Sequence, residues 1–384
     1  MPRTLIVTND FPPRRGGIET FVHEMARRFP PDEVVVLTSS GGPCGRAAIE
    51  AFDAAQPFPV VRRRVRWLLP TPRTEATARA LAVRYGCDRV WFGAAAPLGL
   101  LAGRLGLPSV ATTHGHEMWW AAAPGTRLLL RRVGDECRVV THLTAHTRAR
   151  VARALRPGTR LERLAPGVDP DRFRPADEGA ERADVRRRLG LGAGPSERPV
   201  VLSVSRLVPR KGQDTLIRAL PRVRAAVPGA TLLIVGDGPY ARRLRRLART
   251  TPGLPPGAVV FAGSRPHGAL PPFYAAADVF AMPCRDRRLG LESEGLGIVY
   301  LEAAAAGLPV LAGRSGGAPE TVRDGETGHV VDGRDVRAVA DRLVELLTAP
   351  GAMGEKGRAR AVREWSWDAS ARRLRALLSL TVEA

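Results

Sequence analysis

Short apolar runs recur along the chain, and most end in a loop of glycine and polar residues that leads into a helical pattern. Runs of this length, bounded by turn residues and separated by helices, predict buried strands of a parallel sheet. We therefore expect an α/β fold. The predicted strands lie at residues 5–8, 34–38, 110–113, 200–204, 232–235, 259–264, 279–282 and 309–313.

The domain organisation follows from the length. A chain of 384 residues exceeds one ordinary core and predicts two domains. A proline-rich segment, 165–175, separates the halves. We place the first domain at 1–168 and the second at 169–365, and we expect the last helix, about 366–384, to cross back to the first domain.

The net charge of +21 indicates a polyanionic partner, such as nucleic acid, an anionic membrane or a phosphorylated substrate. The arginines are spread along the chain without a recognition-helix, RNP or zinc-finger pattern, and aromatic residues make up only 5%. We therefore expect no nucleic-acid partner.

The cysteines and the apolar runs bear on the compartment. The four cysteines lie far apart without a C-x-x-C pair, which favours reduced thiols in the cytoplasm. The predicted first strand begins at about Thr4, so we expect no signal peptide. The longest uncharged apolar run, Val90 to Gly103, is interrupted by Pro97 and is too short to span a bilayer.

The segment from Val60 to Pro70 is strongly basic. It sets four arginines beside Trp67, Leu68 and Leu69. Such a mixture is typical of a surface that rests on anionic headgroups. It is equally typical of a basic edge strand that is protected against aggregation.

Two carboxylates, Glu294 and Glu302, bracket a glycine-rich loop that runs into an alanine-rich helical segment. The first turn of a helix presents unpaired backbone N–H groups, which bind phosphate oxygens, while carboxylates bind hydroxyl groups. The pattern predicts a site for a phosphorylated sugar. The alternative is an amphipathic helix start with two solvated acids.

A second basic loop follows the strand at 200–204. It places Arg206 and Lys211 at the carboxyl end of the strand, where open α/β sheets bind their ligands. Two fixed cations there would neutralise a departing diphosphate. Lys211 is one of only two lysines among 59 basic residues, which favours a specific role over a solvated surface charge.

The first half carries weaker signals. Gly16 and Gly17 precede a helix without the G-x-G-x-x-G spacing of dehydrogenases, but they allow a close backbone approach to an anion. His114 and His116 follow a strand, and no third ligand cluster accompanies them. Asp169 and Asp171 mimic a D-x-D metal motif but lie between the domains. We therefore expect no metal site.

In combination these motifs resemble the family-4 retaining glycosyltransferases of the GT-B fold, from end to end of the chain. The shared phrases are Thr8–Pro13, Trp91–Pro97, Thr113–Glu117, Ser205–Asp214, Glu294–Glu302 and Ser315–Glu320. The resemblance implies two Rossmann-like domains that face each other across a cleft. It is strongest to the actinobacterial branch that transfers mannose from GDP-mannose to phosphatidylinositol mannosides.

The resemblance also implies roles for single residues. Arg206 and Lys211 would clamp the donor diphosphate, while Glu294 and the backbone of Leu296, Gly297, Ile298 and Val299 would hold the sugar. Glu302 would take the ribose, Ser264 and Arg265 would lie near the base, and His114 would contact the sugar. Gly16 and Gly17 would approach the phosphates. The residues expected to contact the acceptor or the membrane are Asn9, Asp10, Arg62, Arg63, Arg64, Arg66 and Trp67.

The implied activity is mannose transfer to an inositol phospholipid glycolipid, with an α-1,6 linkage, at the inner face of the plasma membrane and without a metal. Two alternatives remain open. One is a family-4 enzyme that uses another nucleotide sugar and a soluble inositol phosphate or polysaccharide acceptor. The other is a non-catalytic nucleotide- or polyanion-binding protein.

Overall fold

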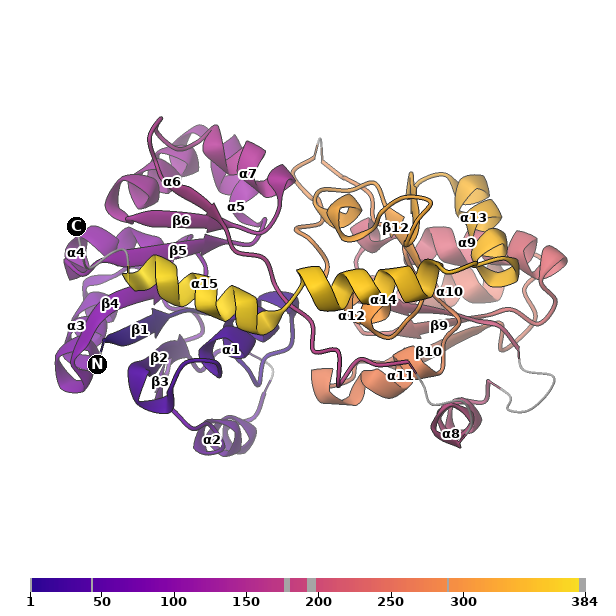
Figure 1. The fold of residues 1–384 in the computed structure, drawn as a ribbon, viewed down its shortest axis with the longest axis horizontal. Helices are drawn as coiled ribbons and strands as arrows, with labels where there is room; N and C mark the ends of the chain where they lie inside the picture. The colour runs from indigo at the N-terminus through magenta and orange to yellow at the C-terminus, as the bar shows by residue number, and fades with distance from the viewer. Residues whose placement is uncertain (1, 43, 176–179, 192–197, 289, 380–384) are drawn as a thin grey trace. The chain divides into compact units, whose positions relative to one another are not determined.

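The computed structural model describes residues 2–42, 44–175, 180–191, 198–288 and 290–379 (Figure 1). The chain divides into two compact units, one of Met1–Pro166 with Trp367–Ala384 and the other of Gly167–Ser366. The sequence placed this boundary between residues 168 and 169. The end of the predicted C-terminal helix, residues 380–384, lies outside the described residues.

The first unit is built on a parallel sheet, which has seven strands in its described part, in the order β3-β2-β1-β4-β5-β6-β7. The core strands are almost completely buried, as expected where helices cover both faces of a parallel sheet. The strands are β1 (Arg3–Val7), β2 (Val34–Ser39), β3 (Val60–Arg63), β4 (Cys87–Phe92), β5 (Ser109–Thr113), β6 (Val139–His142) and β7 (Leu161–Arg163).

The helices of this unit include the end of the chain. The C-terminal helix α15 (Trp367–Ser379) packs on α1, β4 and β5, and Figure 1 shows it in yellow along the strands of the first unit. Its Trp367 is buried, with its ring 5.8 Å from that of Phe21. The other helices are α1 (Gly17–Ala26), α2 (Arg46–Ala54), α3 (Pro72–Tyr85), α4 (Ala102–Leu105), α5 (Glu117–Ala122), α6 (Pro124–Glu136) and α7 (Ala145–Ala152).

The second unit repeats this plan. Its parallel sheet has six strands in the described residues, in the order β10-β9-β8-β11-β12-β13: β8 (Val200–Val204), β9 (Thr231–Val235), β10 (Val259–Gly263), β11 (Val279–Met282), β12 (Val310–Gly313) and β13 (Gly328–Val331). The helices are α8 (Ala180–Arg188), α9 (Gln213–Ala226), α10 (Ala241–Thr250), α11 (Pro271–Ala275), α12 (Ile298–Ala305), α13 (Val336–Thr348) and α14 (Met353–Glu364).

The predicted α/β class with two Rossmann-like parallel sheets is therefore confirmed. In each unit the strand order reverses direction once, between β1 and β4 in the first and between β8 and β11 in the second. The carboxyl ends of the strands at such a reversal are where doubly wound sheets bind ligands. The predicted cleft between the domains stays a prediction.

Candidate functional site

The candidate site of the second unit lies at its reversal point. The loop after β8 contains Arg206 and Lys211, and the loop after β11 leads to Glu294, so the adjacency of these strands brings the two loops together. Gly212 permits the contact. It has a positive φ of 79°, and a Cβ placed on it would lie 2.1 Å from the carbonyl oxygen of Pro283.

Lys211 and Glu294 form a buried ion pair in this place. Lys211 Nζ donates to Glu294 Oε2 at 2.6 Å, and Arg210 Nη1 donates to the same oxygen at 2.8 Å. Lys211 and Glu294 are 8% and 7% exposed. Two residues that the sequence assigned to different parts of a donor are thus bound to each other, and Arg210 is a partner that the sequence did not single out.

The electrostatics of this pair favour the carboxylate. Burial opposes ionisation of Glu294, but the charges of Lys211 and Arg210 outweigh it and lower the pKa of Glu294 to about 2. The thiol of Cys284 lies 3.6 Å from Glu294 Oε2 and is a further donor, because burial raises its pKa to about 12. Tyr300 closes the cluster by donating to the carbonyl of Met282 at 2.6 Å.

The backbone of Glu294 is fixed by the segment after β12. Its N–H donates to Ser315 Oγ at 3.2 Å, and its carbonyl accepts from the N–H of Gly317 at 2.9 Å. A Cβ on Gly316, which has a φ of 54°, would lie 1.9 Å from that carbonyl oxygen. The motif Ser315–Glu320 therefore acts on the site by holding Glu294 in place.

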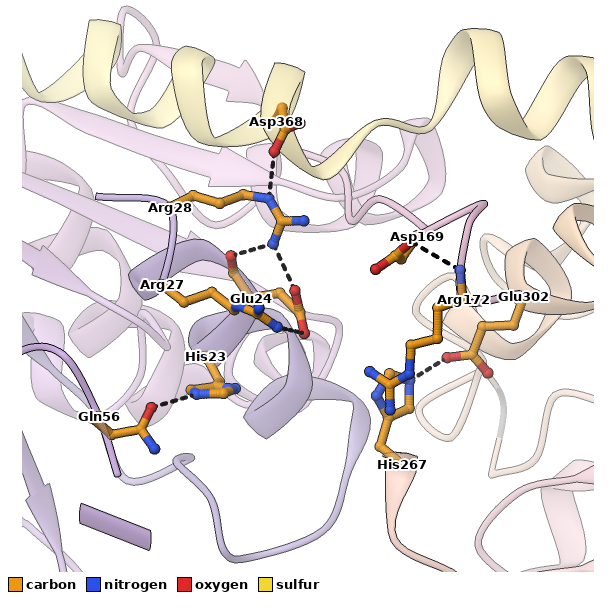
Figure 2. A network of polar contacts seen from close by, with 10 residues as sticks. All are labelled: His23, Glu24, Arg27, Arg28, Gln56, Asp169, Arg172, His267, Glu302 and Asp368. Carbon is orange, nitrogen blue, oxygen red and sulfur yellow. Dashed lines mark hydrogen bonds and ion pairs between the residues drawn. The ribbon is translucent and has the colours of Figure 1, made fainter. Parts of the chain in front are cut away.

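Glu302 lies on α12 and is 2% exposed. Its two carboxylate oxygens have different partners. Oε2 accepts from the hydroxyl of Tyr274 at 2.7 Å. Oε1 hydrogen-bonds with His267 Nε2 at 2.7 Å, as Figure 2 shows. Burial and the neighbouring Glu302 raise the pKa of Tyr274, which keeps its hydroxyl protonated as a donor. Tyr274 and His267 are supporting residues that the sequence analysis missed.

The other residues predicted to bind the donor lie on loops that follow strands of the second sheet, or at the start of α12. Gly297 caps α12 and no side chain caps the helix, while Leu296 is buried and Ile298 begins the first turn, which continues through Val299. Ser264 and Arg265 follow β10, in the loop that leads to His267. Arg206 is exposed.

His114 of the first unit is buried at the end of β5. Its Nε2 lies 2.6 Å from the carbonyl oxygen of Gly93, and its ring packs edge-on against Phe21. Glu117 Oε2 accepts from the backbone N–H of His114 at 2.9 Å. Burial lowers the pKa of His114, so its ring is neutral at pH 7. Gly16 caps α1 and Gly17 begins it, as predicted for a loop before a helix.

The basic segment of the first unit is less exposed than its sequence suggests. Arg62 is paired with Asp53 at 2.7 Å, and Arg63 donates to Thr74 Oγ1 at 3.1 Å. Leu68 is fully buried, and its backbone N–H and carbonyl are both bound by the side-chain amide of Asn9. Asn9 therefore holds this loop in place, while Asp10 beside it is half-buried.

What remains on the surface of this segment is four residues. Arg64 and Arg66 are exposed, and Trp67 and Leu69 are 46% and 55% exposed. The guanidinium of Arg14 lies 4.6 Å from the centre of the Trp67 ring. We call Arg64, Arg66, Trp67 and Leu69 the exposed basic loop.

Two further findings concern metals and membranes. Within the described residues, no group of three His, Cys, Asp or Glu side chains is arranged to hold a metal ion. Asp169 Oδ1 instead accepts from the backbone N–H groups of Asp171 and Arg172, so the D-x-D segment forms a turn. Figure 2 shows the bond from Arg172. No helix in the described part of the chain has both the length and the apolar character needed to cross a membrane.

Comparisons with known proteins identify the family. The family described as Glycosyltransferase Family 4 matches residues 15–172, and that described as Glycosyl transferases group 1 matches residues 198–349. A GDP-mannose-dependent alpha-(1-6)-phosphatidylinositol monomannoside mannosyltransferase of Mycobacterium tuberculosis is 49% identical over 383 residues, which cover 97% of each chain.

A second relative, a GDP-mannose-dependent monoacylated alpha-(1-6)-phosphatidylinositol monomannoside mannosyltransferase of Corynebacterium glutamicum, is 44% identical over 98% of this chain and 97% of its own. Among solved structures, Anabaena Alr3699/HepE in complex with UDP and glucose superposes with a TM-score of 0.82 and 20% identity, over 98% of this chain and 100% of that one. This likeness concerns the fold. The chain belongs to family 4 of the glycosyltransferases and has the GT-B fold.

Proposed function

We propose that this glycosyltransferase moves mannose from GDP-mannose to a phosphatidylinositol mannoside, with retention of the anomeric configuration and formation of an α-1,6 bond. The observation that carries the proposal is the buried pair of Lys211 and Glu294 at the reversal point of the second sheet. It occurs in a chain that is 49% identical, over 97% of its length, to a transferase named for this donor and acceptor.

The chemistry assigned to the site is positioning and charge neutralisation. Arg206 and Lys211 bind the diphosphate and stabilise the charge that develops as it leaves. Glu294 and the first turn of α12 hold hydroxyls of the mannose, and Glu302 holds the ribose. The acceptor hydroxyl attacks on the face from which the diphosphate departs, and its proton passes to a phosphate oxygen. No step in this proposal uses a metal.

The acceptor lipid requires access to a membrane, and we assign that contact to the exposed basic loop. Arginines beside an exposed tryptophan and leucine suit the anionic headgroup region. The proposal places the protein peripherally on the inner face of the plasma membrane.

The test is transfer of labelled sugar by the purified chain to extracted phosphatidylinositol monomannoside and, in a separate reaction, to a soluble inositol phosphate. GDP-mannose, UDP-glucose and UDP-N-acetylglucosamine are supplied in parallel, each with and without EDTA. We expect lipid-soluble label from GDP-mannose alone, undiminished by EDTA. Label from a UDP-sugar, or only in a soluble acceptor, would move the chain to another branch of the family. No transfer from any donor would favour a non-catalytic nucleotide-binding protein.

A further inference from the structure

One oxygen of Glu294 accepts from two cations. Lys211 Nζ and Arg210 Nη1 lie 2.6 Å and 2.8 Å from Oε2. On the proposed function, which this inference takes as its basis, Lys211 serves the diphosphate and Glu294 serves the sugar. A diphosphate carries more negative charge than a carboxylate, so a bound donor draws Lys211 toward itself and weakens its hold on Glu294.

If Lys211 moves toward the diphosphate, Glu294 needs another cation beside it. It is 7% exposed, and burial alone disfavours its charged form. If Glu294 were protonated, one of its oxygens would carry a proton and would need an acceptor of its own. The group would then accept fewer hydrogen bonds from sugar hydroxyls. A second cation that stays on the carboxylate while the donor is bound removes this difficulty.

Arg210 has the position and the charge to be this second cation. It lies in the turn Pro209–Lys211, and its backbone carbonyl accepts from the N–H of Arg285 at 2.9 Å. The side chain of Arg210 is 32% exposed, against 10% for Lys211, so it reaches Glu294 from the solvent side. A guanidinium has five N–H donors in a fixed plane and stays charged, so it can keep one bond to Glu294 throughout a reaction.

We propose that Arg210 is a positioning residue for Glu294: it keeps the carboxylate ionised and aimed at the sugar while the donor diphosphate engages Lys211. Arg210 is then needed for turnover more than for donor affinity. This distinguishes it from Arg206 and Lys211, whose loss weakens the grip on the diphosphate.

The experiment compares R210Q and R210K with R222Q, in the mannose-transfer assay and as a function of pH. Arg222 is an exposed arginine on the same unit, paired with Asp341 at 2.7 Å, and serves as the matched control. For R210Q we expect a kcat lowered roughly tenfold to a hundredfold, the equivalent of a lost hydrogen bond to a charged group. We expect little change in KM for GDP-mannose, and an acid limb of the kcat profile that moves to higher pH.

We expect R210K to restore most of the rate and to return the acid limb toward the wild-type position, and we expect R222Q to behave as wild type. A raised KM with an unchanged kcat and acid limb in R210Q would overturn the inference and make Arg210 a ligand of the donor. The wild-type rate in the same assay tests the proposed function separately, so wild-type behaviour of R210Q would refute this inference alone.

A double substitution covers the case in which R210Q folds poorly. E294Q removes the charge that needs the cations, so R210Q/E294Q relieves the cost of a buried carboxylate that has lost one of its two cations. If Arg210 acts through Glu294, the double variant transfers mannose at the same residual rate as E294Q. A further loss that multiplies with that of E294Q would contradict the proposal.

Discussion

Glu294 keeps its charge in surroundings where burial alone would neutralise it. Lys211 and Arg210 hold its pKa at about 2, against an ordinary value of 4.5. A carboxylate with a lowered pKa stabilises the folded chain at every pH above its ordinary value. That contribution to stability is lost as the pH falls through the pKa that Glu294 has in the folded chain.

The lowered pKa of Glu294 predicts how the stability of the chain depends on pH. The difference in free energy of unfolding between wild type and E294Q should be largest at neutral pH. It should narrow as the pH falls from about 4.5 toward 2. Urea titrations of both proteins at a series of pH values measure it. A difference that is constant across this range would show that Lys211 and Arg210 do not lower the pKa of Glu294.

Single residues also show which features of the site could be predicted from the sequence and which could not. The motifs singled out Lys211 and Glu294, which the fold brings together, because a fixed spacing after a strand is a local signal. Arg210 and Tyr274 were missed, because their importance comes from contacts with residues 84 and 28 positions away. Arg62 was expected on the surface, but its pairing with Asp53 cannot be read from a run of arginines.

At the scale of elements, the site depends on a close approach between the loop after β8 and the loop after β11. Eight of the thirteen described strands were predicted, since buried parallel strands are continuous apolar runs. The sequence missed β4, β6, β7 and β13 and indicated β3 only as an alternative. The order of the strands does not follow from that pattern, because β8 and β11 are neighbours in the sheet although β9 and β10 lie between them in the chain. The loop contact is therefore a property of the fold.

Gly212 offers a test of this approach. In G212A, a left-handed residue that is not glycine costs about 1–2 kcal/mol, and its Cβ also meets the Pro283 carbonyl. We expect the free energy of unfolding of G212A, measured in urea, to fall by more than this strain alone. We also expect G212A to bind GDP more weakly. G229A is the control, because Gly229 has a φ of 83° but its nearest contact is a side-chain carbon at 3.4 Å. Equal losses in the two variants would contradict a role for the loop contact.

At the scale of the whole molecule, the net charge of +21 is spread over both units, so a membrane contact has to be distinguished from general attraction to anions. Two arginines near an anionic surface contribute about 2 kcal/mol, or roughly thirtyfold in affinity. R64Q/R66Q should therefore weaken sedimentation with phosphatidylinositol-containing vesicles by about that factor.

R242Q/R246Q is the matched control for vesicle binding, since it removes two exposed arginines from α10 and the same net charge. We expect it to bind vesicles almost as wild type does. If both double variants lose affinity equally, the binding reflects total charge and the exposed basic loop has no special part in it.

If Lys211 and Glu294 form the donor site of a mannosyltransferase, the variants K211A and E294A should transfer mannose slowly. Removing a group that stabilises developing charge costs roughly 10²–10³ in rate. We expect losses of at least this size from GDP-mannose to lipid, in proteins whose circular dichroism is unchanged. K356A and E355A, which remove the same charges from exposed positions on α14, should transfer normally. Near-normal turnover in K211A or E294A would show that these residues do not form the donor site.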